Sequence, residues 1–235
     1  MMTYNIYGAR ATDPSNAADL QALAEVIRAQ EPDFVVLQEV DVFTNRSGKA
    51  VHQARDLAAL TGMFWHFTKA IDISGGQYGD AVLSKYEILD TYDYHLSVSP
   101  EQTGENRSVC MVRVKVEDKT LYVASTHLDH LASETSRLYQ AHQLADIVEG
   151  VDGDLLIGGD FNAVPESKTM SIVKEFLTPG ARSGFQFTFP SDNPNRTLDY
   201  ILYKPSDRIS VQNYRVIKAR ASDHCPVAAT LKIKK

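Results

Sequence analysis

The chain has 235 residues, of which 43% are hydrophobic and 23% are charged, a composition typical of a soluble globular protein with a sizeable core. Its formal net charge of -6 at pH 7 gives no general attraction to a polyanion, so nucleic acid is not favoured as a substrate. Its two cysteines are too few for a disulfide framework and lack a zinc-binding spacing, and no apolar run approaches the roughly 18 residues of a membrane helix.

The start of the chain does not have the form of a secretion signal, because no basic segment precedes an apolar stretch there. Residues 1–6 run directly into a predicted strand instead. The sequence therefore predicts a soluble protein, which we expect to be a monomer. Its compartment stays open between the cytoplasm and export after removal of a leader.

Hydrophobic periodicity in the first half of the chain predicts alternating strands and helices. A helix is expected to begin at Asn16 and to stop at Pro32. The continuous apolar run 34–37 predicts a strand that is covered on both faces and ends in Gln38 and Glu39. The next predicted elements are a helix over 52–60 that ends at Gly62, strands over 64–73 and 81–83, and a turn over 74–77.

In the second half, residues 112–116 alternate between valine and charged side chains, which predicts a hairpin with one wet face that pairs with residues 121–125. Apolar periodicity then predicts a helix over 134–149 and a buried strand over 155–157. The polar stretch 178–196, with aromatic residues at 185, 187 and 189, is long enough for a functional loop but equally suits a surface connection. The remaining predicted strands are 197–203, 209–217 and 226–233.

No internal repeat, linker or low-complexity tract divides these elements, so we predict one α/β domain over residues 1–235. Hairpins occur together with buried apolar runs. This mixture favours two packed sheets with helices outside over one parallel sheet.

Five short polar clusters each end a predicted strand: Tyr4-Asn5-Ile6, Gln38-Glu39-Val40, Thr126-His127-Leu128, Gly159-Asp160-Phe161-Asn162 and Ser222-Asp223-His224. None is long enough to build a site alone, so the fold must bring them together. Carboxylates, amides and imidazoles gathered in one place are typical of a hydrolase that uses a hard metal ion.

Glu39 closes an apolar strand, where an ionised carboxylate costs several kcal/mol unless it is paired or binds a cation. Asp223 and Asn5 offer further oxygen ligands at element ends, the choice expected for Mg2+ or Mn2+ rather than zinc. Taken singly, each of these residues is more often a cap or a salt-bridge partner.

Two glycines precede Asp160 and permit a tight backbone, and they direct Asp160 and Asn162 to the same side, two residues apart. A carboxylate there can orient or deprotonate water, and an amide can hold a phosphoryl oxygen. The alternative is a simple Asx turn.

His224 follows Asp223, and Asp199 begins another predicted strand, so a hydrogen bond from His224 to Asp199 would fix the imidazole tautomer. His224 is then either a base or a charged stabiliser of the transition state. His127, at a strand end, could donate to a phosphate oxygen. The histidines assigned to structural hydrogen bonding are His52, His130 and His142.

Taken in order, these segments resemble the motifs of the endonuclease/exonuclease/phosphatase superfamily: Tyr4-Asn5, Gln38-Glu39, residues 76–84, Ser125-Thr126-His127, Gly159-Asp160-Phe161-Asn162, Leu198-Asp199-Tyr200-Ile201 and Ser222-Asp223-His224. The resemblance spans residues 3–231. Each motif is common alone, but seven in order make a chance match improbable.

The resemblance implies a DNase I-like fold, a four-layered α/β-sandwich of two packed mixed sheets flanked by helices, with a Mg2+- or Mn2+-dependent site. The roles that it implies are metal ligand for Glu39, with Asn5 and Asp223 near the ion, water orientation for Asp160, phosphate binding for Asn162 and His127, and base or stabiliser for His224 paired with Asp199.

Two further groups have equally plausible structural interpretations. Tyr78 could reach the phosphate or be a packed hairpin aromatic, and Arg107 could clamp a phosphate oxygen or form a surface salt bridge. Residues 127–130, followed by Arg137 and Gln140, resemble the phosphodiesterase and phosphatase branches of the family more than the abasic-site nucleases, which implies that this helix buttresses the site. Tyr7 stands where relatives place an acidic residue or a histidine, which puts a second metal position in doubt.

The leading hypothesis is a metal-dependent phosphoester hydrolase whose partner is a small-molecule or lipid-headgroup phosphodiester or phosphomonoester. A DNA or RNA nuclease of the same fold is an alternative that the negative charge disfavours. The third alternative is a non-catalytic binding module. The presence of every expected catalytic group argues against it.

Overall fold

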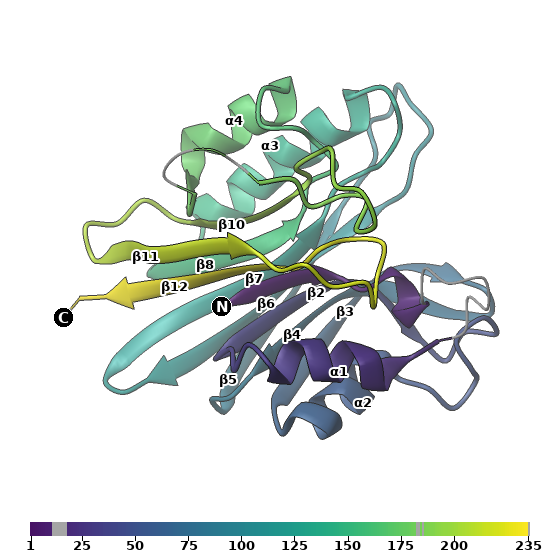
Figure 1. Ribbon diagram of the computed structural model, residues 1–235. Helices are drawn as coiled ribbons and strands as arrows, with labels where there is room; N and C mark the ends of the chain where they lie inside the picture. The colour runs from purple at the N-terminus through teal and green to yellow at the C-terminus, as the bar shows by residue number, and fades with distance from the viewer. Residues whose placement is uncertain (11–17, 182–183, 185, 235) are drawn as a thin grey trace.

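Two six-stranded sheets pack face to face, and helices cover their outer faces (Figure 1). The computed structural model describes residues 1–10, 18–181, 184 and 186–234. The first sheet has the order β11-β12-β1-β2-β4-β3. Its strands are β1 (Met2–Asn5), β2 (Phe34–Val42), β3 (Phe64–Ile73), β4 (Gly76–Ser84), β11 (Ile209–Val216) and β12 (Val227–Ile233).

The second sheet has the order β5-β6-β7-β8-β10-β9. Both sheets are mixed, because β1 pairs with β2 and β7 pairs with β8 in parallel, whereas the neighbouring pairs are antiparallel. The strands of the second sheet are β5 (Ile88–Leu96), β6 (Arg107–Val116), β7 (Lys119–His127), β8 (Asp154–Asp160), β9 (Thr178–Pro179) and β10 (Asp199–Tyr203).

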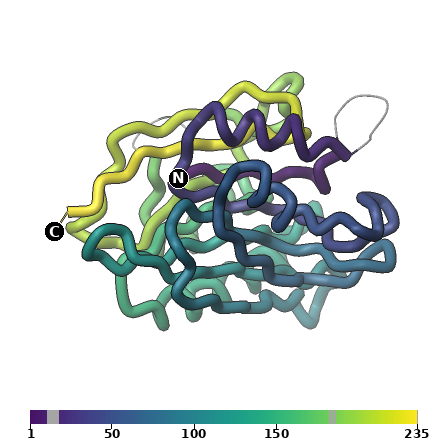
Figure 2. The backbone as a smooth tube through the Cα atoms, turned by 90° about the horizontal axis from the view of Figure 1, so that it is seen from below, coloured from purple at the N-terminus to yellow at the C-terminus, as the bar shows by residue number. Residues whose placement is uncertain are grey.

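Three buried apolar clusters occupy the three interfaces of a four-layered sandwich. Seen from below, α1 (Leu20–Arg28) and α2 (Gln53–Thr61) lie in front of the first sheet (Figure 2) and bury Leu23 and Leu57 against it. The middle cluster joins the two sheets through residues such as Val36 and Val123. On the far side, α3 (Thr135–Glu149) and α4 (Lys168–Phe176) cover the second sheet. The predicted four-layered α/β-sandwich is confirmed.

Several predicted details are wrong. The first helix begins at Leu20, capped by the Asp19 carboxylate, which accepts from the Ala22 N–H at 2.9 Å; Asn16 lies outside the described residues. The turn after β3 is shorter than predicted, since β4 resumes at Gly76 and places Tyr78 inside a strand. The hairpin of β6 and β7 does have the predicted wet side over 112–117, where Val112 and Val114 are buried and Lys115 is exposed, but residues 107–112 of β6 are all buried between the sheets and helix α3.

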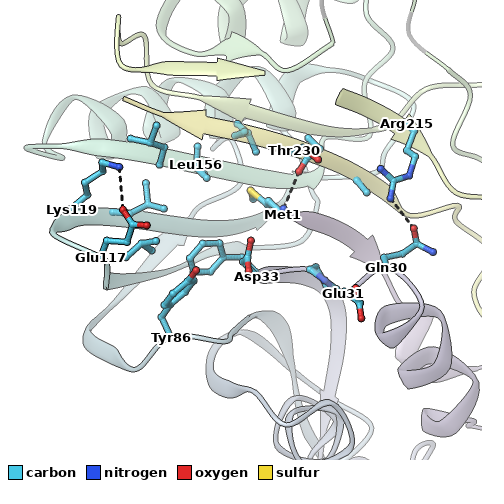
Figure 3. A pocket seen from close by; sticks show the side chains of 18 residues that line it. Met1, Gln30, Glu31, Asp33, Tyr86, Glu117, Lys119, Leu156, Arg215 and Thr230 are labelled. Atoms are coloured by element: carbon cyan, nitrogen blue, oxygen red, sulfur yellow. Dashed lines mark hydrogen bonds and ion pairs between the residues drawn. The ribbon is translucent and has the colours of Figure 1, made fainter. Parts of the chain in front are cut away.

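The two ends of the sandwich differ. At one end, where β1 and β2 begin, a cavity of about 280 Å³ is lined by Met1, Tyr86, Leu156 and Thr230 among others (Figure 3). The polar clusters singled out in the sequence lie at the other ends of these strands. No helix among the described residues is long and apolar enough to cross a membrane.

Candidate active site

Strand ends from both sheets meet at a pocket of about 300 Å³. Eight of the ten predicted site residues line it: Glu39, Tyr78, Arg107, His127, Asp160, Asn162, Asp223 and His224. The other two, Asn5 and Asp199, lie directly behind and hydrogen-bond to pocket residues. The fold therefore brings all ten together from opposite ends of the sequence.

A β-bulge presents Glu39 to the pocket. The pairing of β2 with β4 shifts register between Leu37 and Val40, and Glu39 has a left-handed backbone with φ of 58°. The carboxylate oxygen Oε1 accepts a hydrogen bond from Asn5 Nδ2 at 3.1 Å. Burial raises the pKa of Glu39, an effect that the Asn5 hydrogen bond partly offsets.

Asn5 connects the two sheets. Its Nδ2 donates to Glu39 on the first sheet and, at 3.0 Å, to Asp160 Oδ2 on the second. Its Oδ1 accepts from the backbone N–H of Tyr7 at 3.0 Å, which fixes the orientation of the amide. Fully buried, Asn5 holds the two carboxylates at a constant separation.

The two glycines before Asp160 permit close approach of neighbouring chain, not a turn, since both belong to β8. A Cβ at Gly159 would lie 2.1 Å from the backbone oxygen of Thr126, and one at Gly158 would lie 2.7 Å from Val36 Cγ2 in the facing sheet. The glycines thus let β7 and the facing sheet approach β8 closely, next to Asp160 at the end of β8.

We predict that Gly159→Ala destabilises the protein by at least about 2 kcal/mol, because the added methyl group must displace the backbone of β7. Gly62→Ala is the matched control. Gly62 has a φ of 68°, but no heavy atom lies within 4 Å of the position that its added methyl group would take, so only backbone strain of about 1 kcal/mol applies. Urea unfolding of both variants measures the difference, and equal losses would contradict the packing argument.

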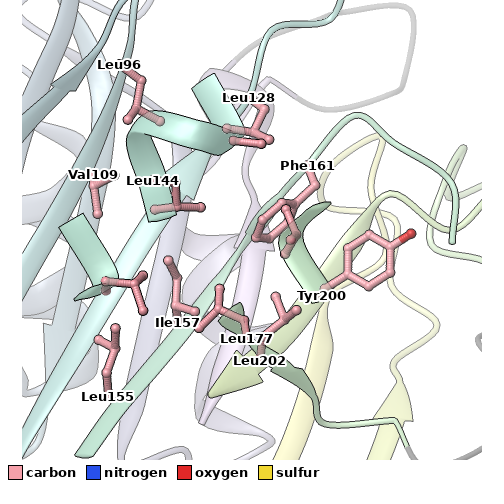
Figure 4. Packing of buried hydrophobic residues seen from close by; sticks show 14 of the residues in the cluster. Leu96, Val109, Leu128, Leu144, Leu155, Ile157, Phe161, Leu177, Tyr200 and Leu202 are labelled. Atoms are coloured by element: carbon pink, nitrogen blue, oxygen red, sulfur yellow. The ribbon is translucent and has the colours of Figure 1, made fainter. Parts of the chain in front are cut away.

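Core side chains anchor the catalytic positions. Phe161 and Tyr200, next in sequence to Asp160 and Asp199, are fully buried and pack edge to face with ring centroids 5.7 Å apart (Figure 4). The Tyr200 hydroxyl donates to the backbone oxygen of Ala163 at 2.7 Å. The backbone on both sides of the site is therefore tied to the core beneath α3 and α4.

His224 lies between two carboxylates. Its Nδ1 is 2.9 Å from Asp199 Oδ2, and its Nε2 is 3.6 Å from Asp160 Oδ2. Burial lowers the pKa of His224, but the carboxylates of Asp199 and Asp160 outweigh burial and raise the pKa to about 10. The imidazole is thus a cation at neutral pH. Its partner Asp199 is the one that the sequence predicted.

Asp160 accepts the backbone N–H of Asn162 at 2.8 Å through Oδ1, while Oδ2 accepts from Asn5. Burial raises the pKa of Asp160 to about 7, although the charge of His224 acts in the opposite direction. A carboxyl group with a pKa near neutrality suits exchange of a proton with water at physiological pH.

His127 completes the wall beside Asp160. Its Nε2 is 3.0 Å from Asn162 Nδ2, and its Nδ1 is 3.3 Å from an Arg107 nitrogen. Burial, assisted by the charge of Arg107, holds the pKa of His127 well below its usual range. This histidine is therefore neutral, in contrast to His224, and the two rings have different chemistry.

Arg107 is buried, with 2% of its surface exposed, and forms an ion pair with the partly exposed Glu105 at 3.0 Å, so the salt bridge considered from the sequence is present at the pocket wall. Its Nη1 lies 3.5 Å from the Tyr78 hydroxyl, so these two residues form one polar wall of the pocket. Tyr78 is itself buried, and burial raises its pKa well above the usual range. The hydroxyl therefore keeps its proton.

Sequence reasoning missed six pocket residues: Arg46, Ile71, Ile73, Glu105, His130 and Phe189. His130, assigned to structural hydrogen bonding, is exposed at the pocket and contacts Arg107 through Nδ1 at 3.2 Å. Phe189 packs on His224 with ring centroids 4.7 Å apart, so the stretch 178–196 does reach the site; Phe185 lies outside the described residues. The proximity of His130 to His127 in the sequence was the signal that pointed to it.

Helix α3 supports the loop that carries His130. The backbone N–H of Asp129 donates to the Gln140 side chain at 2.8 Å, and Arg137 donates to the Asp129 backbone oxygen at 3.0 Å. His142 is exposed on the same helix, and His52 caps α2. The expected buttress of Arg137 and Gln140 is present.

Two groups of side chains could hold a metal ion. Asp160, Asp199 and His224 place ligand atoms within 4.8 Å of one another. Glu39 and Asp223 form the other group and both line the pocket; burial raises the pKa of each. No described residue forms an ion pair with either of these two carboxylates, whereas His224 already pairs with Asp199.

The sequence model of the endonuclease/exonuclease/phosphatase family matches residues 2–224. Nocturnin from Rattus norvegicus is 24% identical over 203 residues, 77% of this chain and 47% of that protein, so the chain spans about half the length of this curated relative. A crystal structure of an endonuclease/exonuclease/phosphatase from Beutenbergia cavernae covers 99% of this chain and 71% of its own, with 23% identity and a TM-score of 0.79. A mannosyl-6-phosphatase from Bacteroides thetaiotaomicron covers 98% of both chains, with 18% identity and a TM-score of 0.77.

Proposed function

Because the chain belongs to the endonuclease/exonuclease/phosphatase family, whose members are phosphoester hydrolases, we propose that it hydrolyses a small-molecule or lipid-headgroup phosphodiester or phosphomonoester with Mg2+ or Mn2+. The observation that carries the proposal is the convergence of Asp160 and His224 in one pocket, with Asn5 bound to Asp160 from behind, where a near-neutral carboxyl group lies beside a cationic imidazole. The net charge of -6 supports a small substrate over nucleic acid.

In this proposal Asp160 orients the attacking water and takes its proton. The water oxygen forms a bond to phosphorus while the bond from phosphorus to the leaving oxygen breaks. The imidazolium of His224 stabilises negative charge that develops on the phosphoryl oxygens, and Asp199 keeps its proton in place. Asn162 and His127, which flank Asp160, hold a phosphoryl oxygen.

Glu39 and Asp223 have the donor chemistry that Mg2+ or Mn2+ needs. Both are carboxylates on the pocket wall without an ion-pair partner among the described residues, and Asn5 orients Glu39. A bound ion supplies neutralisation of charge at the phosphoryl and leaving oxygens. The group formed by Asp160, Asp199 and His224 is the competing location, but its imidazole is already committed to Asp199.

We expect Glu39→Gln to weaken Mn2+ binding by roughly 100-fold, because it removes a charged ligand while keeping the Asn5 contact. Asp199→Asn should leave Mn2+ affinity within about threefold of the unmodified protein, because it changes only the competing group. Titration calorimetry with protein freed of metal by a chelator measures both. If Asp199→Asn weakened Mn2+ binding more than Glu39→Gln does, the ion would bind at Asp160, Asp199 and His224 instead.

Hydrolysis of a substrate panel tests the function itself. The panel comprises bis-p-nitrophenyl phosphate, p-nitrophenyl phosphate, sphingomyelin, inositol phosphates and abasic DNA, each with Mg2+ and with Mn2+. We expect turnover of small esters and little of DNA. Preferential cleavage of nucleic acid with steep salt dependence would favour the nuclease alternative, and no hydrolysis at all would favour a binding module.

A further inference from the structure

Arg46 is a pocket residue with no part in the chemistry proposed above. It lies in the loop after β2 and is held by Asp41, whose side chain is fully buried. Asp41 accepts from Arg46 Nε and Nη2, each at 2.8 Å, in a bidentate pair. The same carboxylate accepts from Thr44 at 3.1 Å and Ser47 at 2.5 Å. The guanidinium therefore has a fixed position before any ligand arrives.

The remaining nitrogen of Arg46, Nη1, is free to bind a ligand. No described residue accepts a hydrogen bond from it. The guanidinium carbon lies 5.6 Å from the centroid of the Tyr78 ring, and the side chain is 26% exposed. Arg46 thus lines the pocket beside the Tyr78 ring, while its two other nitrogens stay bound to Asp41.

His130 provides a second donor on this wall. Arginine can only donate hydrogen bonds, so the contact of Arg107 Nη2 with His130 Nδ1 makes Nδ1 the acceptor. The ring proton of neutral His130 must then be on Nε2. Glu105 lines the same wall, but its carboxylate pairs with Arg107 at 3.0 Å, which compensates its charge locally.

We propose that Arg46 and His130 form a subsite for a second anionic group, so that the preferred substrates carry a carboxylate or another phosphate besides the ester that is cleaved. This inference rests on the proposed function for the position of the reacting phosphoryl group beside Asp160. Because Arg46 is already fixed, little conformational entropy is lost when it binds an anion. Its charge-assisted hydrogen bond discriminates against a neutral group at the same place.

The test compares ligands that differ only in the second anionic group. Glycerol 2-phosphate and 2-phosphoglycerate differ by a hydroxymethyl group in place of a carboxylate, and fructose 6-phosphate and fructose 1,6-bisphosphate differ by a phosphate. Titration calorimetry in excess Mg2+ measures their affinities in an Asp160→Asn background, in which hydrolysis of the ligands during the titration is suppressed. In at least one pair, we expect the ligand with the second anionic group to bind about tenfold more tightly than its partner. Which pair shows this difference identifies the preferred second group as a carboxylate or a phosphate.

Arg46→Gln should reduce this affinity ratio to about one. Arg113→Gln is the matched control, since Arg113 also pairs with an aspartate, Asp90, but does not line the pocket; it should keep the ratio. If Arg46→Gln does not fold because Asp41 is left buried alone, the double variant Asp41→Asn/Arg46→Gln replaces it.

A ratio near one in the Asp160→Asn background with Arg46 intact, or equal weakening of both ligands by Arg46→Gln, would overturn the subsite. Failure of the proposed function has a different signature. It would appear as no hydrolysis in the substrate panel, while calorimetry would still report the ratio.

Discussion

Asp160→Asn should reduce turnover by roughly 10³-fold and leave the protein at least as stable at pH 8. The amide keeps the volume of the side chain and its oxygen can still accept from Asn162, but its nitrogen can neither accept from Asn5 nor take a proton from water. Burial raises the pKa of Asp160 to about 7, well above the roughly 3.9 of an unfolded aspartate. An acid whose pKa rises on folding costs stability above its unfolded pKa, and this cost is complete above pH 7. Replacement by a neutral amide removes the cost.

Hydrolysis of the best small ester and thermal unfolding at pH 8 measure the two effects together. Asp154→Asn is the control, because Asp154 begins the same strand, pairs with Arg208 at 3.3 Å and does not line the pocket. This control should retain activity and lose some stability. If the turnover of Asp160→Asn were close to that of the unmodified protein, Asp160 would not be the group that orients the water.

The layers of the fold were predictable from buried runs such as 34–37 and 155–157, since strands covered on both faces leave a continuous apolar signal. Strand β5 and helix α4 are the longest elements that were not anticipated. Strand β5 lies at an edge with its side chains alternately half-buried and exposed, so aspartates interrupt its apolar pattern. Helix α4 has nine residues and buries few apolar side chains, although Ser167 caps it through the Met170 N–H at 3.1 Å.

The residues of the candidate site also include some that were predictable from the sequence and some that were not. Asp160 was predictable because it ends β8 and because strand ends from a sandwich converge. Glu39 was predicted to close its strand, but β2 continues to Val42 and the β-bulge, not a strand end, turns Glu39 into the pocket. Arg46 was not predictable, and His130 was indicated only by its nearness to His127 in the sequence, because each lies in a loop whose path depends on a distant contact. Asp41 fixes the first loop, and α3 fixes the second through Gln140. Sequence spacing carries no record of such contacts.

The pair formed by His224 and Asp199 predicts the second large effect. Asp199→Asn should reduce turnover by roughly 10²- to 10³-fold, because the amide stabilises the imidazolium less well than a carboxylate. It should also move the alkaline limb of the pH–rate profile to lower pH. The two carboxylates raise the pKa of His224 to about 10 against the opposing effect of burial, and loss of one lets the pKa fall. A histidine that works as a cation then loses its proton, and its function, at a lower pH.

The control is another pair of the same kind. His66 Nε2 lies 2.8 Å from Asp93 Oδ1 at the edges of the two sheets, outside the pocket. Asp93→Asn should therefore change neither turnover nor the profile. If Asp199→Asn lowered turnover with the alkaline limb unmoved, His224 would not be the group whose deprotonation ends activity, and Asp199 would serve only to hold the ring in place. A shifted limb identifies the imidazolium itself as the form that stabilises the reacting phosphoryl group.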